Sequence, residues 1–259
     1  MDMQKLCAII RETDRIFFDN ALRADVHQKG DADFVTRADI GISDYLHARL
    51  QEEFPAIGFI SEEGDTAADP DSDYWILDPI DGTTNFMYGM PLCAVSLALY
   101  EHGCVTAGVI YAPYTQELFW AQKGEGAYLN STRIFCSRCS TLTRCVSAFE
   151  LNPYYKDDYR AALVHTEKLY RRCQDVRVFG CASLSMAYVA CGRADAFLGR
   201  YLKPWDYAAG IILVQEAGGT VTDLCGGLCA TVPRQHIVAA GTAIYPSYLA
   251  LLQDENTAF

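Results

Sequence analysis

Basic residues are scarce in this sequence. Its 259 residues include 21 Lys and Arg against 33 Asp and Glu, which gives a formal net charge of −12 at pH 7. A nucleic-acid binding surface needs clustered Lys and Arg to neutralise phosphates. Because acidic residues are in excess here, we do not expect a nucleic-acid partner. Negative charge also disfavours an anionic membrane surface. Hydrophobic residues make up 51% of the chain, enough for a sizeable core and too many for a disordered protein.

Long apolar runs and export signals are also missing. The longest uncharged stretch, residues 82–100, contains several polar residues and Pro91, so we do not expect a membrane span. Residues 1–5 lack the layout of a secretory signal. The 11 cysteines are irregularly spaced and odd in number, which is typical of reduced thiols. Together these features predict a cytoplasmic protein.

Several well-known catalytic motifs are absent. The sequence contains no Gly-x-Ser-x-Gly elbow, no Walker loop and no dinucleotide-binding glycine pattern. The five histidines are scattered and none lies beside a cysteine pair, so a zinc site is not expected. These absences argue against a serine hydrolase, a protein with a common nucleotide-binding motif, and a zinc enzyme.

Hydrophobic periodicity predicts a layered α/β chain. One large domain or two packed halves fit the length, and the polar, Cys-rich stretch near 130–145 places the boundary between residues 1–140 and 141–259. The first half is expected to hold a helix over 3–23, a polar turn over 27–33, a helix from Asp39 to Pro55, and strands over 57–60, 74–77, 92–100, 104–112 and 117–122. The second half is expected to alternate strands over 145–149, 175–179, 194–198 and 237–240 with helices over 157–172, 182–191 and 206–217.

Acidic residues gather at strand ends beside glycine. The strand over 74–77 leads to Asp78, Pro79 interrupts strand pairing, and Asp81 follows beside Gly82. Adjacent carboxylates repel each other unless a cation lies between them, and oxygen-only ligands suit Mg²⁺, Mn²⁺ or Ca²⁺. Backbone N–H groups after Gly82 suit a phosphate. With the hydroxyl of Thr83, this set indicates metal-assisted phosphoester hydrolysis.

Each of these acids also has a purely structural interpretation. Asp-Pro and Asp-Gly are frequent turn formers. Asp206 lies at the start of an expected helix, where an aspartate is typical of an N-cap. From the residues alone, both interpretations stay open.

Several specific strings are spread over most of the chain. Residues 78–86 read Asp-Pro-Ile-Asp-Gly-Thr-Thr-Asn-Phe, and residues 205–210 read Trp-Asp-Tyr-Ala-Ala-Gly. In these strings the sequence closely resembles the inositol monophosphatase family of Mg²⁺-dependent, lithium-sensitive phosphatases. Further matches cover residues 33–39, 58–63, 126–130, 180–183, 192–195 and 216–219.

The resemblance implies an αβαβα sandwich, usually a homodimer, with two or three Mg²⁺ ions per active site and Mn²⁺ as a possible substitute. Most metal ligands would lie in the N-terminal half, and the substrate pocket in the C-terminal half. The implied metal ligands are Glu62, Asp78, the carbonyl of Ile80, Asp81 and Asp206. The implied catalytic residues are Thr83, oriented by Asp39 to activate the attacking water, and Glu62, which helps to place the third ion. The implied substrate contacts are Asp81, Gly82, Thr83, Gly180, Ala182 and Arg200, with Lys29 approaching the metal site.

Two positions bear on the substrate. Inositol-selective members of the family place a glutamate where this chain has Gly199, which removes an acceptor for ring hydroxyls. The pair Thr84-Asn85 stands where related adenosine-bisphosphate phosphatases carry Lys-Glu, which favours the inositol-phosphatase branch. We therefore expect a phosphomonoesterase for a small sugar or polyol phosphate such as inositol 1-phosphate. NADP, a nucleotide bisphosphate, histidinol phosphate and fructose 1,6-bisphosphate remain alternatives, as does a non-catalytic metal- or phosphate-binding regulator.

Overall fold

Two β-sheets form the frame of the protein, a computed structural model that describes residues 1–30, 33–64, 72–151, 155–229 and 235–254. Within those residues the larger sheet has seven strands and the smaller has five. The larger sheet runs β3 (Gly58–Ser61), β4 (Tyr74–Asp81), β5 (Ala94–Glu101), β6 (Cys104–Ala112), β7 (Glu117–Gln122), β8 (Gly126–Leu129) and β9 (Thr132–Ile134). The smaller sheet runs β11 (Asp175–Arg177), β10 (Val146–Glu150), β12 (Ala196–Leu202), β14 (Gln235–Gly241) and β13 (Gly219–Thr222).

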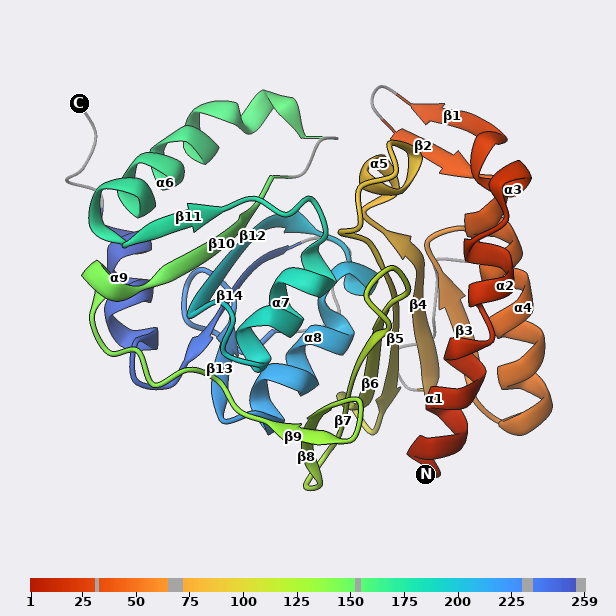
Figure 1. Cartoon of the computed structure of the whole chain (residues 1–259). Helices are drawn as coiled ribbons and strands as arrows, with labels where there is room; N and C mark the ends of the chain where they lie inside the picture. The colour runs from red at the N-terminus through yellow and green to blue at the C-terminus, as the bar shows by residue number, and fades with distance from the viewer. Residues whose placement is uncertain (31–32, 65–71, 152–154, 230–234, 255–259) are drawn as a thin grey trace.

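Helices cover both sheets and fill the space between them (Figure 1). On the outer face of the larger sheet lie α1 (Met3–Arg11) and α4 (Arg37–Glu53), and on the outer face of the smaller sheet lie α6 (Tyr159–Arg172) and α9 (Tyr245–Gln253). The middle layer consists of α7 (Ala182–Ala190) and α8 (Pro204–Glu216), which contact strands of both sheets. This layering confirms the predicted αβαβα sandwich.

The middle helix α8 is held tightly against the larger sheet. Its residues are almost all buried and apolar, because sheets cover it on two sides. At Gly108 of β6 a Cβ atom would lie 2.7 Å from Ile212 Cγ2 and 2.9 Å from the backbone of Ala209. Only glycine permits this close approach. The first turn of α8, which carries Asp206, is therefore placed by a rigid contact.

The N-terminal region differs from the prediction. In place of one helix over 3–23, the chain forms α1, α2 (Asp14–Phe17) and α3 (Asn20–Ala24). The hydroxyl of Thr13 donates to the carbonyl of Ile10 at 2.6 Å, and Asp19 accepts from the N–H of Ala21 at 2.8 Å. These side chains compete with helical hydrogen bonds and break the helix. The predicted turn over 27–33 is also wrong, since β1 (Val26–Gly30) pairs with β2 (Asp33–Thr36) as a hairpin.

Some further elements were not predicted from the sequence. These are the short strands β8, β9 and β13 and the helix α9. The segment after Gly82 forms the short helix α5 (Thr83–Met87). All 11 cysteines are free thiols. No helix among the described residues is long and apolar enough to cross a membrane.

Candidate active site

An acidic cavity of about 270 Å³ lies where the two sheets and the middle helices meet. Its walls come from the ends of β3, β4, β10 and β12, the start of α5, the turn before α7 and the first turn of α8. The lining residues include Glu62, Asp78, Ile80, Asp81, Gly82, Thr83, Glu150, Gly180, Ala182 and Asp206. Segments far apart in the sequence thus bring the predicted metal ligands to one place.

An irregularity in β4 lets Asp78 and Asp81 face the same cavity. In a regular strand, residues three apart point to opposite faces. Here the pairing of β4 with β5 shifts between Asp78 and Asp81, and such a bulge re-aims side chains. The sequence predicted that Pro79 would end strand pairing; instead β4 continues to Asp81, and Pro79 lies inside the irregular step.

Asp39 and Asp206 occupy matching positions in the first turns of two helices. The Oδ2 atom of Asp39 accepts from the N–H of Thr36 at 2.8 Å, and Oδ2 of Asp206 accepts from the N–H of Lys203 at 2.8 Å. Asp39 is the third residue of α4, which begins at Arg37 and not at Asp39 as expected. Asp206 is the third residue of α8, so it is not the N-cap that its place in the sequence suggested. In both cases a backbone N–H at the N-cap holds the carboxylate in place, and at Asp39 the hydroxyl of Thr36 also accepts from the N–H of Asp39, which completes a capping box.

Burial and mutual repulsion make the charged state of these acids unfavourable. Burial, followed by the charges of Glu62, Asp81 and Asp206, raises the pKa of Asp78 well above its usual range. Burial is also the main reason why the pKa values of Glu62 and Asp39 rise to about 7. A divalent cation among these groups would reverse both effects.

The donors fit a hard cation such as Mg²⁺. They are oxygen atoms only, and backbone N–H groups hold Asp78 (from Ile80, 3.1 Å) and Asp81 (from Ser183, 2.6 Å) in place. In the described part of the chain, no three Asp, Glu, His or Cys side chains are already arranged to hold an ion. Glu62 instead faces Lys203, with Oε1 3.8 Å from Nζ.

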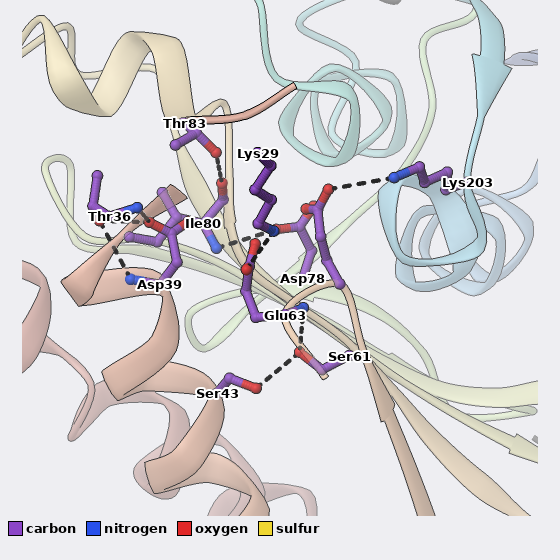
Figure 2. Close-up of polar contacts among 11 residues, drawn as sticks. Lys29, Thr36, Asp39, Ser43, Ser61, Glu63, Asp78, Ile80, Thr83 and Lys203 are labelled. Atoms are coloured by element: carbon purple, nitrogen blue, oxygen red, sulfur yellow. Dashed lines mark hydrogen bonds and ion pairs between the residues drawn. The ribbon is translucent and has the colours of Figure 1, made fainter. Parts of the chain in front are cut away.

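Thr83 and Asp39 lie near each other but have other hydrogen-bond partners (Figure 2). The hydroxyl of Thr83 donates to the carbonyl of Ile80 at 3.1 Å, while Asp39 accepts from both the N–H and the hydroxyl of Thr36. No hydrogen bond joins Thr83 to Asp39 in the described structure. Beside them, Gly82 has φ +85°, and a Cβ atom there would lie 3.0 Å from the carbonyl oxygens of Gly180 and Leu92. Glycine is required at this turn.

Basic side chains also reach the acids. Lys29 of β1 forms an ion pair with Glu63, whose side chain is 6% exposed, so the β1–β2 hairpin contributes a cation to the site (Figure 2). Lys203 lies near Glu62 and over the ring of Trp205. The sequence did not predict a role for Glu63, because its partner is 34 positions away.

Most of the predicted substrate contacts line the cavity, but one does not. Gly82, Thr83, Gly180 and Ala182 line the cavity, but Arg200 does not. Arg200 is 4% exposed, and its Nη1 lies 2.6 Å from Nδ1 of His165. The prediction that Arg200 binds substrate is therefore not supported by its position.

Hydrogen bonds of two buried side chains support the cavity wall near Gly180, and no local sequence pattern predicts them. Glu150 accepts from the N–H groups of Phe179 and Gly180, both at 3.0 Å. The amide of Asn85 donates to the carbonyls of Leu92 and Phe179, both at 2.7 Å. This network fixes the turn against which Gly82 packs.

We expect Asn85→Ala to lower the free energy of unfolding by about 1–3 kcal/mol, because the carbonyls of Leu92 and Phe179, which are partly buried, lose their donor. Urea denaturation measures this change. Asn20→Ala, which removes an exposed asparagine, is the control and should change stability by less than about 0.5 kcal/mol. Equal effects of the two substitutions would show that the network does not brace the turn.

Alternating layers of helix and sheet, with a buried cluster of carboxylates beside a glycine turn, are typical of metal-dependent phosphatases. The model of the inositol monophosphatase family matches residues 3–257, and the chain belongs to this family. It is an enzyme of the phosphoric monoester hydrolase class.

Similar proteins cover nearly the whole chain. An inositol-1-monophosphatase of Caulobacter vibrioides is 37% identical over 239 residues, 91% of this chain and 93% of that protein. The Nus factor SuhB of Escherichia coli is 38% identical over 230 residues, 88% of this chain and 85% of that protein. A crystal structure of the extragenic suppressor protein suhB from Bartonella henselae has a TM-score of 0.91, 35% identity and 98% coverage of both chains.

Mg²⁺ has been observed in this fold. A structure described as an IMPase/NADP phosphatase complexed with Mg²⁺ and phosphate has a TM-score of 0.87 and 22% identity, and covers 98% of this chain and 95% of that one. At this identity the likeness shows the fold alone.

Proposed function

We propose that this protein is a Mg²⁺-dependent phosphomonoesterase that hydrolyses a small sugar or polyol phosphate such as inositol 1-phosphate. The convergence of Glu62, Asp78, Asp81 and Asp206 on one cavity carries this proposal. The carbonyl of Ile80, which lines the same cavity, would be a further ligand. When bound there, Mg²⁺ supplies positive charge that polarises the phosphoryl group and stabilises the transition state. Two or three ions, with Mn²⁺ able to replace Mg²⁺, fit this number of oxygen donors.

The remaining steps fall to the chain's own groups. The backbone N–H groups of Gly82 and Thr83 bind the phosphate. Because Gly82 has no side chain, the phosphate can approach the backbone closely at this turn. Thr83 orients the attacking water through its hydroxyl and passes the proton toward Asp39. For this, the hydroxyl leaves the carbonyl of Ile80 and turns to Asp39, a carboxylate that a bound cation would keep ionised and therefore able to accept a proton.

This role of Thr83 predicts a large effect on turnover. Thr83→Ala should lower kcat by about 10²–10⁴-fold, the usual contribution of a proton-transfer group. Thr83→Ser keeps the hydroxyl and should retain most of the activity. Initial rates of phosphate release at saturating Mg²⁺ measure both. Equal rates for Thr83→Ala and wild type would remove Thr83 from the mechanism.

The substrate is tested by a panel of phosphate esters. We expect phosphate release from inositol 1-phosphate with Mg²⁺ and inhibition by Li⁺. NADP, a nucleotide bisphosphate, histidinol phosphate and fructose 1,6-bisphosphate belong in the same panel. A clear preference for one of these four would keep the chemistry and change the substrate. No release from any ester with Mg²⁺ would contradict the proposal.

A regulatory function is the second candidate, because one relative is named a Nus factor. The complete set of acids and Thr83 favours catalysis, since a purely regulatory protein does not need these costly buried carboxylates. A homodimer is also part of our proposal, and light scattering of the purified protein at micromolar concentration tests it.

A further inference from the structure

We propose that the cavity wall facing the leaving group of the ester is an apolar surface, formed by Leu202 and Leu151. It selects phosphomonoesters whose leaving group presents carbon, not hydroxyl groups, to this wall. The inference rests on the proposed phosphatase function, because it concerns the same cavity. It narrows the substrate class within that function.

The two leucines come from neighbouring strand ends. Leu202 is the last residue of β12, Leu151 directly follows β10, and both line the cavity that contains the acids. Strands β10 and β12 are parallel neighbours in which Glu150 lies opposite Gly199. Both leucines therefore lie at the same end of two neighbouring strands of the smaller sheet, where that end borders the cavity.

Leu202 fills space that a side chain at position 199 would otherwise take. A Cβ atom on Gly199 would lie 2.3 Å from Cδ1 of Leu202 and 2.7 Å from Cζ of Phe197. The pairing of β12 with β14 shifts between Gly199 and Leu202, and Tyr201 has φ +52°. This bulge turns Leu202 into the wall. At this point of β12 the cavity is thus bounded by a leucine and offers no polar side chain.

Two polar side chains that line the cavity, Glu150 and Asn85, make hydrogen bonds within the protein. Oε1 of Glu150 accepts from the N–H of Phe179 and from the hydroxyl of Ser185 at 2.7 Å, and Oε2 accepts from Gly180. The amide nitrogen of Asn85 donates to backbone carbonyls. The carboxylate of Glu150 and the amide nitrogen of Asn85 are therefore less available to a ring hydroxyl.

A hydroxyl placed against this wall would lose its hydrogen bonds to water without replacement. A carbon surface would instead gain from leaving water. An apolar site rejects an added hydroxyl only weakly, whereas a site built to bind hydroxyls rejects an analogue without them strongly. Tolerance of an ester that lacks hydroxyls is consequently the distinguishing property.

The experiment compares two esters with the same ring. Cyclohexyl phosphate and myo-inositol 1-phosphate differ only in the ring hydroxyls, and kcat/KM is measured for both with saturating Mg²⁺. We expect the wild-type enzyme to hydrolyse cyclohexyl phosphate at least as efficiently as the inositol ester. Leu202→Ala should lower the cyclohexyl-to-inositol ratio of kcat/KM by about tenfold, because it removes apolar contact area.

Two further variants separate this effect from a general loss of stability. Leu151 is 50% exposed, so Leu151→Asn should fold normally and lower the ratio in the same direction. Leu198→Ala removes a fully buried leucine from the same strand, in the core with Phe149 and Tyr248. Leu198 does not line the cavity, so Leu198→Ala should leave the cyclohexyl-to-inositol ratio of kcat/KM unchanged.

The possible outcomes test the inference about the leucines separately from the proposed phosphatase function. A tenfold or larger wild-type preference for the inositol ester would overturn the inference. So would a ratio that neither Leu151→Asn nor Leu202→Ala changes. In both cases the enzyme would remain a phosphatase. Hydrolysis of neither ester would overturn the proposed function and the inference with it.

Discussion

Asp81→Asn should yield a folded protein that has lost about 10²–10³-fold in kcat. Asparagine keeps an oxygen that can accept from the N–H of Ser183, now 2.6 Å from Oδ2 of Asp81, so the turn before α7 keeps its anchor. The substitution removes one negative charge from the cavity. The loss of this charge should weaken Mg²⁺ binding, and it is also the reason why kcat falls.

Phosphate release and calorimetric titration of Mg²⁺ measure these two effects. Asp175→Asn provides the matched control, because Asp175 lies on β11 and pairs with Arg177 at the surface. It should change neither quantity. Turnover of Asp81→Asn close to that of the wild type at saturating Mg²⁺ would remove Asp81 from the site.

The metal-free protein should be more stable at pH 5 than at pH 8, and Mg²⁺ should restore most of the difference. Folding raises the pKa of Glu62 from 4.5 to about 7, mainly through burial, and that of Asp39 from 3.8 to about 7. The folded state then holds protons more tightly than the unfolded state. This stability is complete below about pH 4 and is lost as pH rises through about 7.

A shift of this size is worth about 3 kcal/mol for one carboxylate, or about 10 °C in the melting temperature of a chain of this length. Thermal unfolding in EDTA at pH 5 and pH 8, repeated with Mg²⁺, measures it. NaCl at matched ionic strength controls for general screening and should not replace Mg²⁺. A larger stabilisation by Mg²⁺ at pH 5 than at pH 8 would contradict this electrostatic account.

The layered fold could be predicted because its core elements have clear periodicity. Strands β5, β6 and β7 and helices α7 and α8 lie close to their expected positions. The polar hairpin β1–β2 could not be predicted, since all five residues of β1 are exposed and carry no apolar pattern. The breaks between α1, α2 and α3 depend on side-chain hydrogen bonds that compete locally with the helix.

The acidic end of the site was predictable for a different reason. Asp78, Asp81 and Gly82 are close in sequence, so a single string contains them. Glu150 and Asn85 act through contacts with the turn at Phe179–Gly180, which lies 29 to 95 positions away. Such pairs leave no local pattern. The position of Arg200 was misjudged likewise, because its neighbour His165 comes from α6 on another layer.

The central claim is that the buried carboxylates act by holding Mg²⁺ against a phosphate ester. Its most direct test is the initial rate of phosphate release from inositol 1-phosphate by protein stripped with EDTA, before and after Mg²⁺ is added back. We predict no measurable release in EDTA and full recovery with Mg²⁺. An equal rate in both conditions would contradict the claim.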